Sequence, residues 1–196
     1  MGRFAWCMLL ALALASCAGP TLQGPFRVDK PYGGPAPYGE FVHPGIDYAV
    51  KTGAPVIAVA DGTVDYVATP DGPENGLFVR VSHEAAFKSL YGHLDTVFVR
   101  KGDHLKRGDF VGWSGESNGW GKPHYQHLHF GICKPGQNCQ LYSQTLDPGK
   151  FWLGGEPQCF EPGAEYPPDA RQAITLPLAC GDQARDLRKP GREGQN

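Results

Sequence analysis

Short apolar segments separated by turn residues run through the middle of this 196-residue chain, and they constrain its fold more than any other feature. Residues 55–60 are a continuous apolar run, and Asp61-Gly62, a pair typical of hairpin turns, leads into residues 63–67. In residues 77–82 apolar side chains alternate with others, which is the period of a half-buried strand. Many short strands with regular turns predict an antiparallel all-β domain. The 27 glycines and 18 prolines favour turns over long helices.

The length and the net charge of the chain limit its number of domains and its possible classes of function. A chain of 196 residues fits one domain with appendages. The formal net charge of −2 argues against a general nucleic-acid binder, which should carry a basic excess. We therefore expect no nucleic-acid partner.

The N-terminus has the features of an export signal. Phe4 to Ala15 is an apolar run too short to span a bilayer but suited to a signal peptide. It ends in Leu14-Ala15-Ser16-Cys17, which resembles the bacterial lipobox, although an ordinary cleavage site with an incidental cysteine is the alternative. We expect residues 1–17 to be the signal peptide and Cys17 to carry the lipid. The protein would then be exported and anchored to a membrane, with Ala18 favouring the outer membrane and its periplasmic side.

A histidine pair, His127 and His129, is the strongest candidate for chemistry. On a strand these two side chains project from the same face, because residues two apart share a face. A His-x-His pair is weak evidence alone and needs a third ligand and another acid–base group. His43 and Asp47 carry standard zinc donors, and Pro44-Gly45 between them indicates a turn that leads into a strand. An exposed histidine beside a turn-capping aspartate is the alternative interpretation.

Three short motifs with candidate site residues and three turn segments follow one another in a fixed order along the chain. They resemble the lysostaphin/LytM-type zinc endopeptidases, peptidase family M23, over roughly residues 38–153. The resemblance implies a small antiparallel β-sheet domain of the duplicated-hybrid-motif type with a long substrate groove, and cleavage of peptide stems or crosslinks in bacterial peptidoglycan. The matching segments are His43-x3-Asp47, Tyr91-x-His93-Leu94, His127-Leu-His129-Phe130, Gly53-x-Pro55-Val56, Ala60-Asp-Gly-Thr-Val64 and Val111-Gly-Trp-Ser-Gly115.

By position, the resemblance implies one zinc ion per chain, held by His43, Asp47 and His129. It also implies that His93 and His127 are the catalytic histidines, and the sequence leaves open which of them is the general base. Two departures from the family affect groove shape more than activity. Gly131 stands where the family often has Glu, and the loop before His127 is longer, with an added His124-Tyr125-Gln126.

Four cysteines remain after the signal, and an exported protein makes disulfides the expected use. Four cysteines allow three pairings. A second zinc site is the alternative use, but the C-x5-C spacing of Cys133 and Cys139 differs from the usual C-x2–4-C of zinc sites. Nearness in sequence decides which cysteines we expect to pair. The expected pairs are Cys133–Cys139 and Cys159–Cys180.

The chain therefore divides into four parts. Residues 18–37 would be a Gly/Pro-rich tether, residues 38–155 the zinc peptidase domain, and residues 156–196 a disulfide-linked extension, disordered over residues 181–196. The expected function is a zinc metalloendopeptidase that acts on peptidoglycan peptides in cell-wall remodelling. The alternative is a non-catalytic LytM-type module that binds the wall or activates an amidase. Degenerate modules lose ligands or catalytic histidines, and all five residues are present here.

Overall fold

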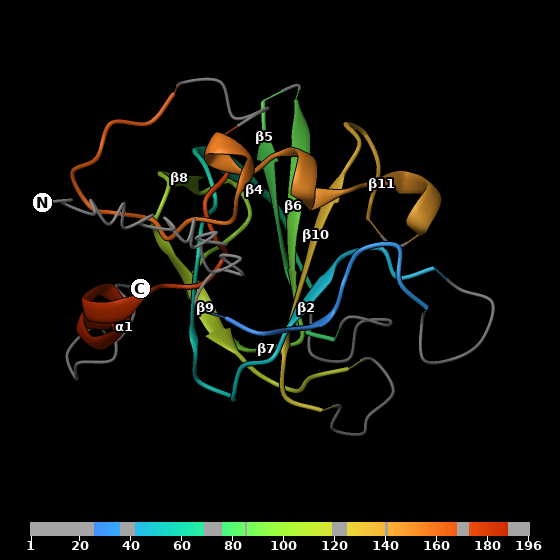
Figure 1. Cartoon of the computed structure of the whole chain (residues 1–196), viewed down its shortest axis with the longest axis horizontal. Helices are drawn as coiled ribbons and strands as arrows, with labels where there is room; N and C mark the ends of the chain where they lie inside the picture. Colours follow the sequence, from blue (N-terminus) through green and yellow to red (C-terminus); the bar gives the residue numbers. More distant parts are fainter. Residues whose placement is uncertain are drawn as a thin grey trace, which may run out of the picture.

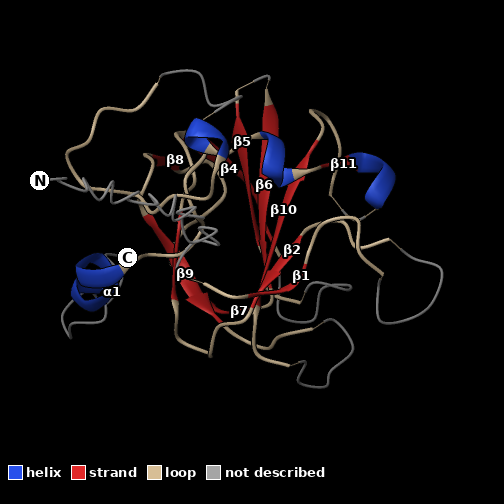
Figure 2. Cartoon of the chain, in the orientation of Figure 1, coloured by secondary structure: helices blue, strands red, loops and turns tan. Residues whose placement is uncertain are grey.

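A computed structural model of the chain describes residues 26–35, 42–68, 76–84, 86–118, 125–139, 141–167 and 173–187. In these residues the protein is mostly antiparallel β-sheet, as the sequence predicted (Figure 1). Short helical segments lie at the periphery of the strands (Figure 2). The strands are β1 (Val28–Lys30), β2 (Ile46–Tyr48), β3 (Pro55–Ile57), β4 (Gly62–Val67), β5 (Val79–His83), β6 (Phe87–Gly92), β7 (Leu94–Val97), β8 (His104–Leu105), β9 (Phe110–Ser114), β10 (Leu128–Cys133) and β11 (Thr145–Leu146). The helical segments are η1 (Tyr142–Gln144), η2 (Pro148–Lys150), η3 (Leu153–Gly155) and α1 (Gly181–Leu187).

The larger sheet has the strand order β1-β2-β10-β6-β5-β4-β8, with β11 paired to β10. Strand β10 carries His129 and begins directly after His127. It lies between β2 and β6, and all six of its residues are buried. In β5, buried Val79, Val81 and His83 alternate with partly exposed residues, which matches the alternation read from the sequence.

A smaller sheet has the strand order β3-β9-β7. The main core combines apolar residues of both sheets, including Val56, Val81, Val111 and Phe130. Strand β7 begins directly after His93, so the catalytic candidate lies where the chain passes from the larger sheet to the smaller one.

The N-terminal segment predicted as a tether is partly folded. Residues 28–30 form β1, which pairs with β2 at the edge of the larger sheet, and His43 N–H donates to the Gly34 carbonyl. The sequence of this stretch is rich in Gly and Pro, which suggested an extended linker, but backbone pairing with β2 holds it on the domain. Residues 18–25 and Cys17 lie outside the described residues.

The C-terminal segment is part of the core rather than an appendage. Ile174, Leu176 and Leu178 are each fully buried in the main core. The backbone runs beside β3, with Ile57 N–H donating to Pro177 and Ala179 N–H donating to Pro55. The segment therefore covers the edge of the smaller sheet, and the domain extends beyond the predicted boundary at residue 155.

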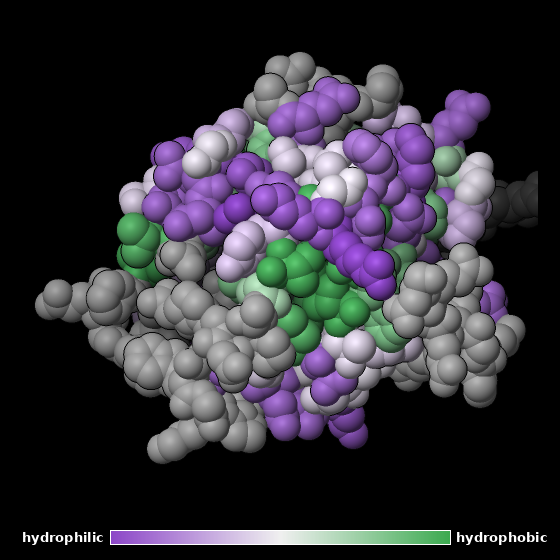
Figure 3. Space-filling model, turned by 180° about the vertical axis from the view of Figure 1, so that it is seen from behind, coloured by the Kyte–Doolittle hydropathy of each residue, from purple (hydrophilic) through white to green (hydrophobic). Residues whose placement is uncertain are grey.

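Residues 181–187 form helix α1, although disorder was predicted from their charge. Leu187 is buried and packs with Ile57 and Ala179, which supplies apolar contact that the local sequence does not reveal. Among the described residues, no helix has both the length and the apolar character needed to cross a membrane. On the coloured part of the surface seen from behind, hydrophilic residues surround an apolar area near the centre, and a smaller apolar area lies toward one edge (Figure 3).

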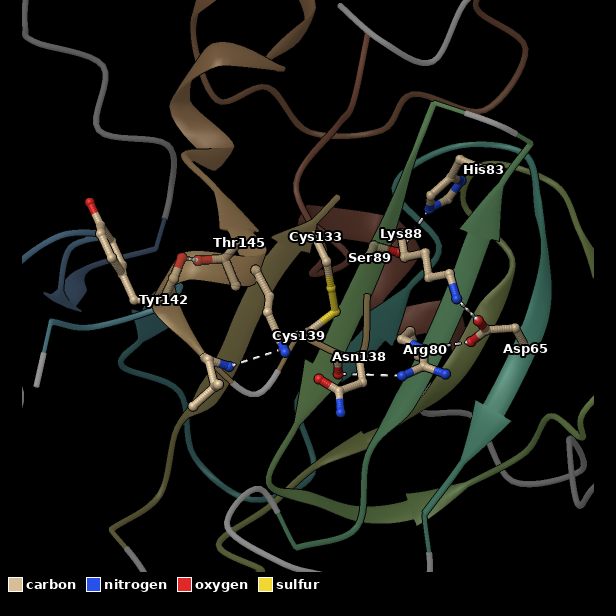
Figure 4. Close-up of a disulfide and its surroundings, with 12 residues drawn as sticks. Asp65, Arg80, His83, Lys88, Ser89, Cys133, Asn138, Cys139, Tyr142 and Thr145 are labelled. Carbon is tan, nitrogen blue, oxygen red and sulfur yellow. Dashed lines mark hydrogen bonds and ion pairs between the residues drawn. A yellow bond between two sulfur atoms is a disulfide. The ribbon is translucent and has the colours of Figure 1, made fainter. Parts of the chain in front are cut away.

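Both expected cysteine pairs are joined in the structure. Cys133–Cys139 closes the hairpin after β10, and Cys159–Cys180 ties the C-terminal segment to the chain after η3. The first bridge packs with Leu90 and Phe78 in a small separate core. Beside it, Arg80 donates to Asp65 and to the Asn138 carbonyl, which links the disulfide hairpin to the sheet (Figure 4).

Candidate metal centre

The pairing of β2 with β10 brings the three predicted zinc ligands together. Asp47 and His129 are direct partners across these antiparallel strands. His129 Nδ1 lies 2.8 Å from Asp47 Oδ1, and His43 Nε2 lies 3.1 Å from the same oxygen and 3.2 Å from His129 Nδ1. All three residues are buried. His43 and Asp47 come from one motif, and His129 comes from a motif more than 80 residues later. Each of the three presents one metal-binding atom to a common point.

Gly45 allows this close approach of the two strands. A Cβ atom at this position would lie 2.4 Å from the Phe130 carbonyl oxygen and 2.8 Å from both Cε1 and Nε2 of His129. These separations are far inside van der Waals contact. The glycine between His43 and Asp47 is therefore required by the His129 ring and the β10 backbone, in addition to forming the turn expected from the sequence.

The N-terminal segment orients the ligands from the other side. The Pro31 carbonyl lies 3.1 Å from His43 Nδ1 and accepts a hydrogen bond from it, so Nε2 of the neutral ring carries the lone pair that a metal ion requires. Lys30 Nζ lies 3.8 Å from Asp47 Oδ2. The segment predicted as a tether thus supports two of the three candidate ligands.

The donor set fits a zinc ion. Burial alone would raise the pKa of the Asp47 carboxyl, but its close contacts with His129 and His43 outweigh burial and hold that pKa well below its usual range. Asp47 is therefore ionised at neutral pH. The three facing atoms are 2.8–3.2 Å apart, close to the edge of about 3.3 Å of a tetrahedron with zinc bonds of ~2.05 Å. Two imidazole nitrogens and a carboxylate are a ligand set of the catalytic type.

The two predicted catalytic histidines lie together beside these ligands. The ring centroids of His93 and His127 are 4.4 Å apart, and His127 Nε2 lies 3.7 Å from Asp47 Oδ1. His127 Nδ1 donates to the Tyr125 carbonyl at 2.7 Å, and His93 Nδ1 donates to the Ser117 carbonyl at 2.7 Å. These bonds place the ring hydrogen on Nδ1, so Nε2 is the unprotonated nitrogen of each neutral ring.

His93 is held in an unusual backbone conformation. Its φ of 59° lies in the left-handed region, which costs a residue with a Cβ about 1–3 kcal/mol and is most common at functional sites. Burial lowers the pKa of His93 to about 3, and repulsion from His127 and His129 adds to that effect. His93 is therefore neutral at physiological pH.

Tyr125 is the site residue that the sequence analysis did not identify. Its hydroxyl donates to Asp47 Oδ2 at 2.6 Å, and its ring stacks on His127 with centroids 4.0 Å apart and planes at 9°. From the sequence, Tyr125 is only one residue of the longer loop before His127. The available signal was its position two residues before His127, because alternate residues of an extended chain share a face.

Two further histidines of the described residues lie outside the site. His83 is buried and bonded to the Asp61 carbonyl and Ser89, and His104 is exposed. His124 lies outside the described residues.

Comparison with known proteins points to one family. The family model described as "Peptidase family M23" matches residues 41–141. Peptidoglycan DD-endopeptidase ShyB of Vibrio cholerae is 34% identical over 46% of this chain and 20% of its own length. Glycyl-glycine endopeptidase ALE-1 of Staphylococcus capitis is 36% identical over 52% of this chain and 28% of its own length.

Among solved structures, the catalytic domain of the antimicrobial peptidase lysostaphin from Staphylococcus simulans superimposes with a TM-score of 0.55 at 25% identity. That match covers 63% of this chain and 89% of the lysostaphin domain. The match covers only 20% and 28% of the lengths of the two curated relatives named above, so the likeness concerns one part of those longer proteins.

Proposed function

This chain belongs to peptidase family M23, and on that premise we propose that it is a zinc-dependent endopeptidase that hydrolyses peptide bonds of bacterial peptidoglycan, in stem peptides or crosslinks. The observation that carries the proposal is the convergence of His43, Asp47 and His129 on one point, with His93 and His127 beside it. The relatives named as peptidoglycan and glycyl-glycine endopeptidases support the same class of reaction.

One zinc ion would be held by His43 Nε2, Asp47 Oδ1 and His129 Nδ1. Bound zinc would supply Lewis acidity, which lowers the pKa of water and polarises a carbonyl group. The site is built to keep this donor set in place, because the Pro31 carbonyl fixes the tautomer of His43 and the strand pairing fixes Asp47 against His129.

The two neighbouring histidines would handle the protons. Each presents an unprotonated Nε2, because its Nδ1 donates to a backbone carbonyl. One imidazole would accept a proton from the attacking water and pass it to the nitrogen of the leaving amine as the C–N bond breaks. While it holds that proton, the imidazolium would also stabilise the negative charge on the former carbonyl oxygen, and the second, neutral ring would accept a hydrogen bond from the water at Nε2. His127 points its Nε2 toward Asp47, and the low pKa of His93 keeps that ring neutral before the reaction.

We further propose that the protein acts from a membrane anchor at Cys17, in the outer membrane and facing the periplasm. The support is the Leu14-Ala15-Ser16-Cys17 sequence after a short apolar run. Labelling with a fatty acid should mark the wild-type protein and not Cys17→Ser. Absence of label on the wild-type protein would refute the anchor without affecting the peptidase proposal.

Digestion of purified sacculi by the protein, with and without a chelator, tests the activity. Mass analysis of the fragments should show a new amine and a new carboxylate at one peptide bond, and chelation should abolish both. Asp47→Ala should lose zinc and digestion together. A non-catalytic module would leave the sacculi intact with zinc bound, and stoichiometric zinc in Asp47→Ala would refute the ligand assignment.

A further inference from the structure

We propose that Tyr125 is a positioning residue that holds both the ligand carboxylate of Asp47 and the imidazole of His127 in working orientation. The inference rests on the proposed function, because it assigns Tyr125 a role in the same zinc site. It adds a residue that lies outside the five-residue set common to the matched motifs.

The two oxygens of the Asp47 carboxylate have different partners, and the Tyr125 hydroxyl binds one of them. Oδ2 accepts the Tyr125 hydroxyl proton at 2.6 Å, while Oδ1 lies 2.8 Å from His129 Nδ1 and 3.1 Å from His43 Nε2. A hydroxyl–carboxylate bond of this length is charge-assisted and strong. It keeps Oδ2 turned away from the other ligands and Oδ1 turned toward them, so the carboxylate offers one oxygen to the ion.

The ring and the backbone of the same residue hold His127. The Tyr125 ring lies parallel to the His127 ring with centroids 4.0 Å apart, and the Tyr125 carbonyl accepts from His127 Nδ1 at 2.7 Å. The stack limits rotation of the imidazole about its side-chain bonds, and the carbonyl fixes its tautomer. His127 is only 1% exposed, whereas Tyr125 is 38% exposed.

Lys30 completes the arrangement from strand β1. Its Nζ lies 4.6 Å from the centroid of the Tyr125 ring and 3.8 Å from Asp47 Oδ2. The cation thus approaches both partners of the hydroxyl–carboxylate bond. Tyr125 is more than one-third exposed and belongs to none of the hydrophobic clusters, so its contacts with Asp47, His127 and Lys30 serve the site more than the core.

Zinc affinity tests the hydroxyl without reference to peptidoglycan. Apoprotein would be titrated with zinc against a competing chelator for wild type, Tyr125→Phe and Tyr66→Phe. Tyr66 is a matched control, since it is a similarly exposed tyrosine whose ring packs on Phe78 in another part of the sheet. Loss of a group that orients a metal ligand typically weakens metal binding about 10–100-fold, so Tyr125→Phe should bind more weakly by that factor and Tyr66→Phe should match wild type.

Cobalt substitution gives a second readout that a purely structural role would not change. The visible absorption of the cobalt-loaded protein reports the coordination of the ion, and release of Asp47 Oδ2 in Tyr125→Phe should alter that spectrum while the melting temperature of the apoprotein stays near wild type. Equal zinc affinity and an unchanged cobalt spectrum in Tyr125→Phe would overturn the hydroxyl role. Failure of wild type to bind zinc would instead refute the proposed function.

Turnover at saturating zinc separates the ring from the hydroxyl. Tyr125→Phe keeps the stacked ring, so any fall in its kcat at saturating zinc reports the loss of the hydroxyl alone. Tyr125→Leu loses the stack, and misplacement of a catalytic group by about 1 Å can cost ~100-fold, so its kcat should fall well below that of Tyr125→Phe with KM little changed. Equal kcat in the two variants would refute the ring's role. Higher turnover in Tyr125→Leu than in wild type would show that Tyr125 merely covers the site, and would also overturn the proposal.

Discussion

Acid should destabilise the fold through His83, a buried histidine that takes no part in the zinc site. Its Nδ1 donates to the Asp61 carbonyl at 2.8 Å. Its Nε2 lies 2.8 Å from the Ser89 hydroxyl oxygen (Figure 4). Burial lowers the pKa of His83 from 6.5 to about 4. In the unfolded chain the ordinary pKa of about 6.5 applies.

The sign and the size of the effect follow from these two values. Between about pH 6.5 and pH 4 the unfolded chain binds a proton at His83 that the folded protein does not, so the free energy of unfolding falls as the pH is lowered through this window. Each pKa unit is worth about 1.36 kcal/mol, so the full shift corresponds to about 3 kcal/mol. The contribution is fully present above pH 6.5.

The assay is denaturant unfolding of the metal-free protein at several pH values from 7.5 to 4, for wild type, His83→Asn and His104→Asn. Chelation removes the pH dependence of zinc binding from the comparison. His83→Asn cannot take up the proton, so its stability should fall less than that of wild type by about 3 kcal/mol over this range. The exposed His104 serves as the control and should follow wild type. Parallel pH profiles for wild type and His83→Asn would refute the reasoning.

Three further outcomes are expected. His93→Ala should keep stoichiometric zinc and lose sacculus digestion by roughly 10²–10⁴-fold; joint loss of zinc and activity would make His93 a ligand instead. Gly45→Ala should weaken zinc binding by displacing His129, because the new Cβ would lie 2.8 Å from its ring atoms, and unaltered affinity in the zinc titration would contradict this. Leu176→Ala should lower the free energy of unfolding by about 2–5 kcal/mol in denaturant titration, because Leu176 is fully buried; a loss below about 1 kcal/mol would show that the C-terminal segment is not part of the core.

The strands of the domain could be predicted from the sequence because their signals are local. Alternation of apolar residues in residues 77–82 and the Asp61-Gly62 turn depend on neighbours a few positions away. The residues of the candidate site could be named because they stand in ordered motifs, and the structure brings His43, Asp47 and His129 together as that order implied. Proximity in sequence was also enough to indicate both disulfide pairs.

Tertiary structure alone decided which other segments belong to the domain. A Gly/Pro-rich stretch gives no local sign that Lys30 and Pro31 will lie against Asp47 and His43, because that contact arises from backbone pairing of β1 with β2. Likewise, the charged C-terminal segment suggested disorder, yet Leu187 is buried against residues far away in the chain.

Tyr125 illustrates the same limit at the site itself. Its contact with Asp47 joins residues 78 positions apart, and the chain brings them within 2.6 Å only when β2 and β10 lie side by side. The local sequence pattern indicates which residues can form strands and which side chains can bind a metal. Long-range strand pairing determines which further residues contact the candidate ligands. The two kinds of information differ because periodicity is a property of neighbouring residues and burial is a property of the assembled sheets.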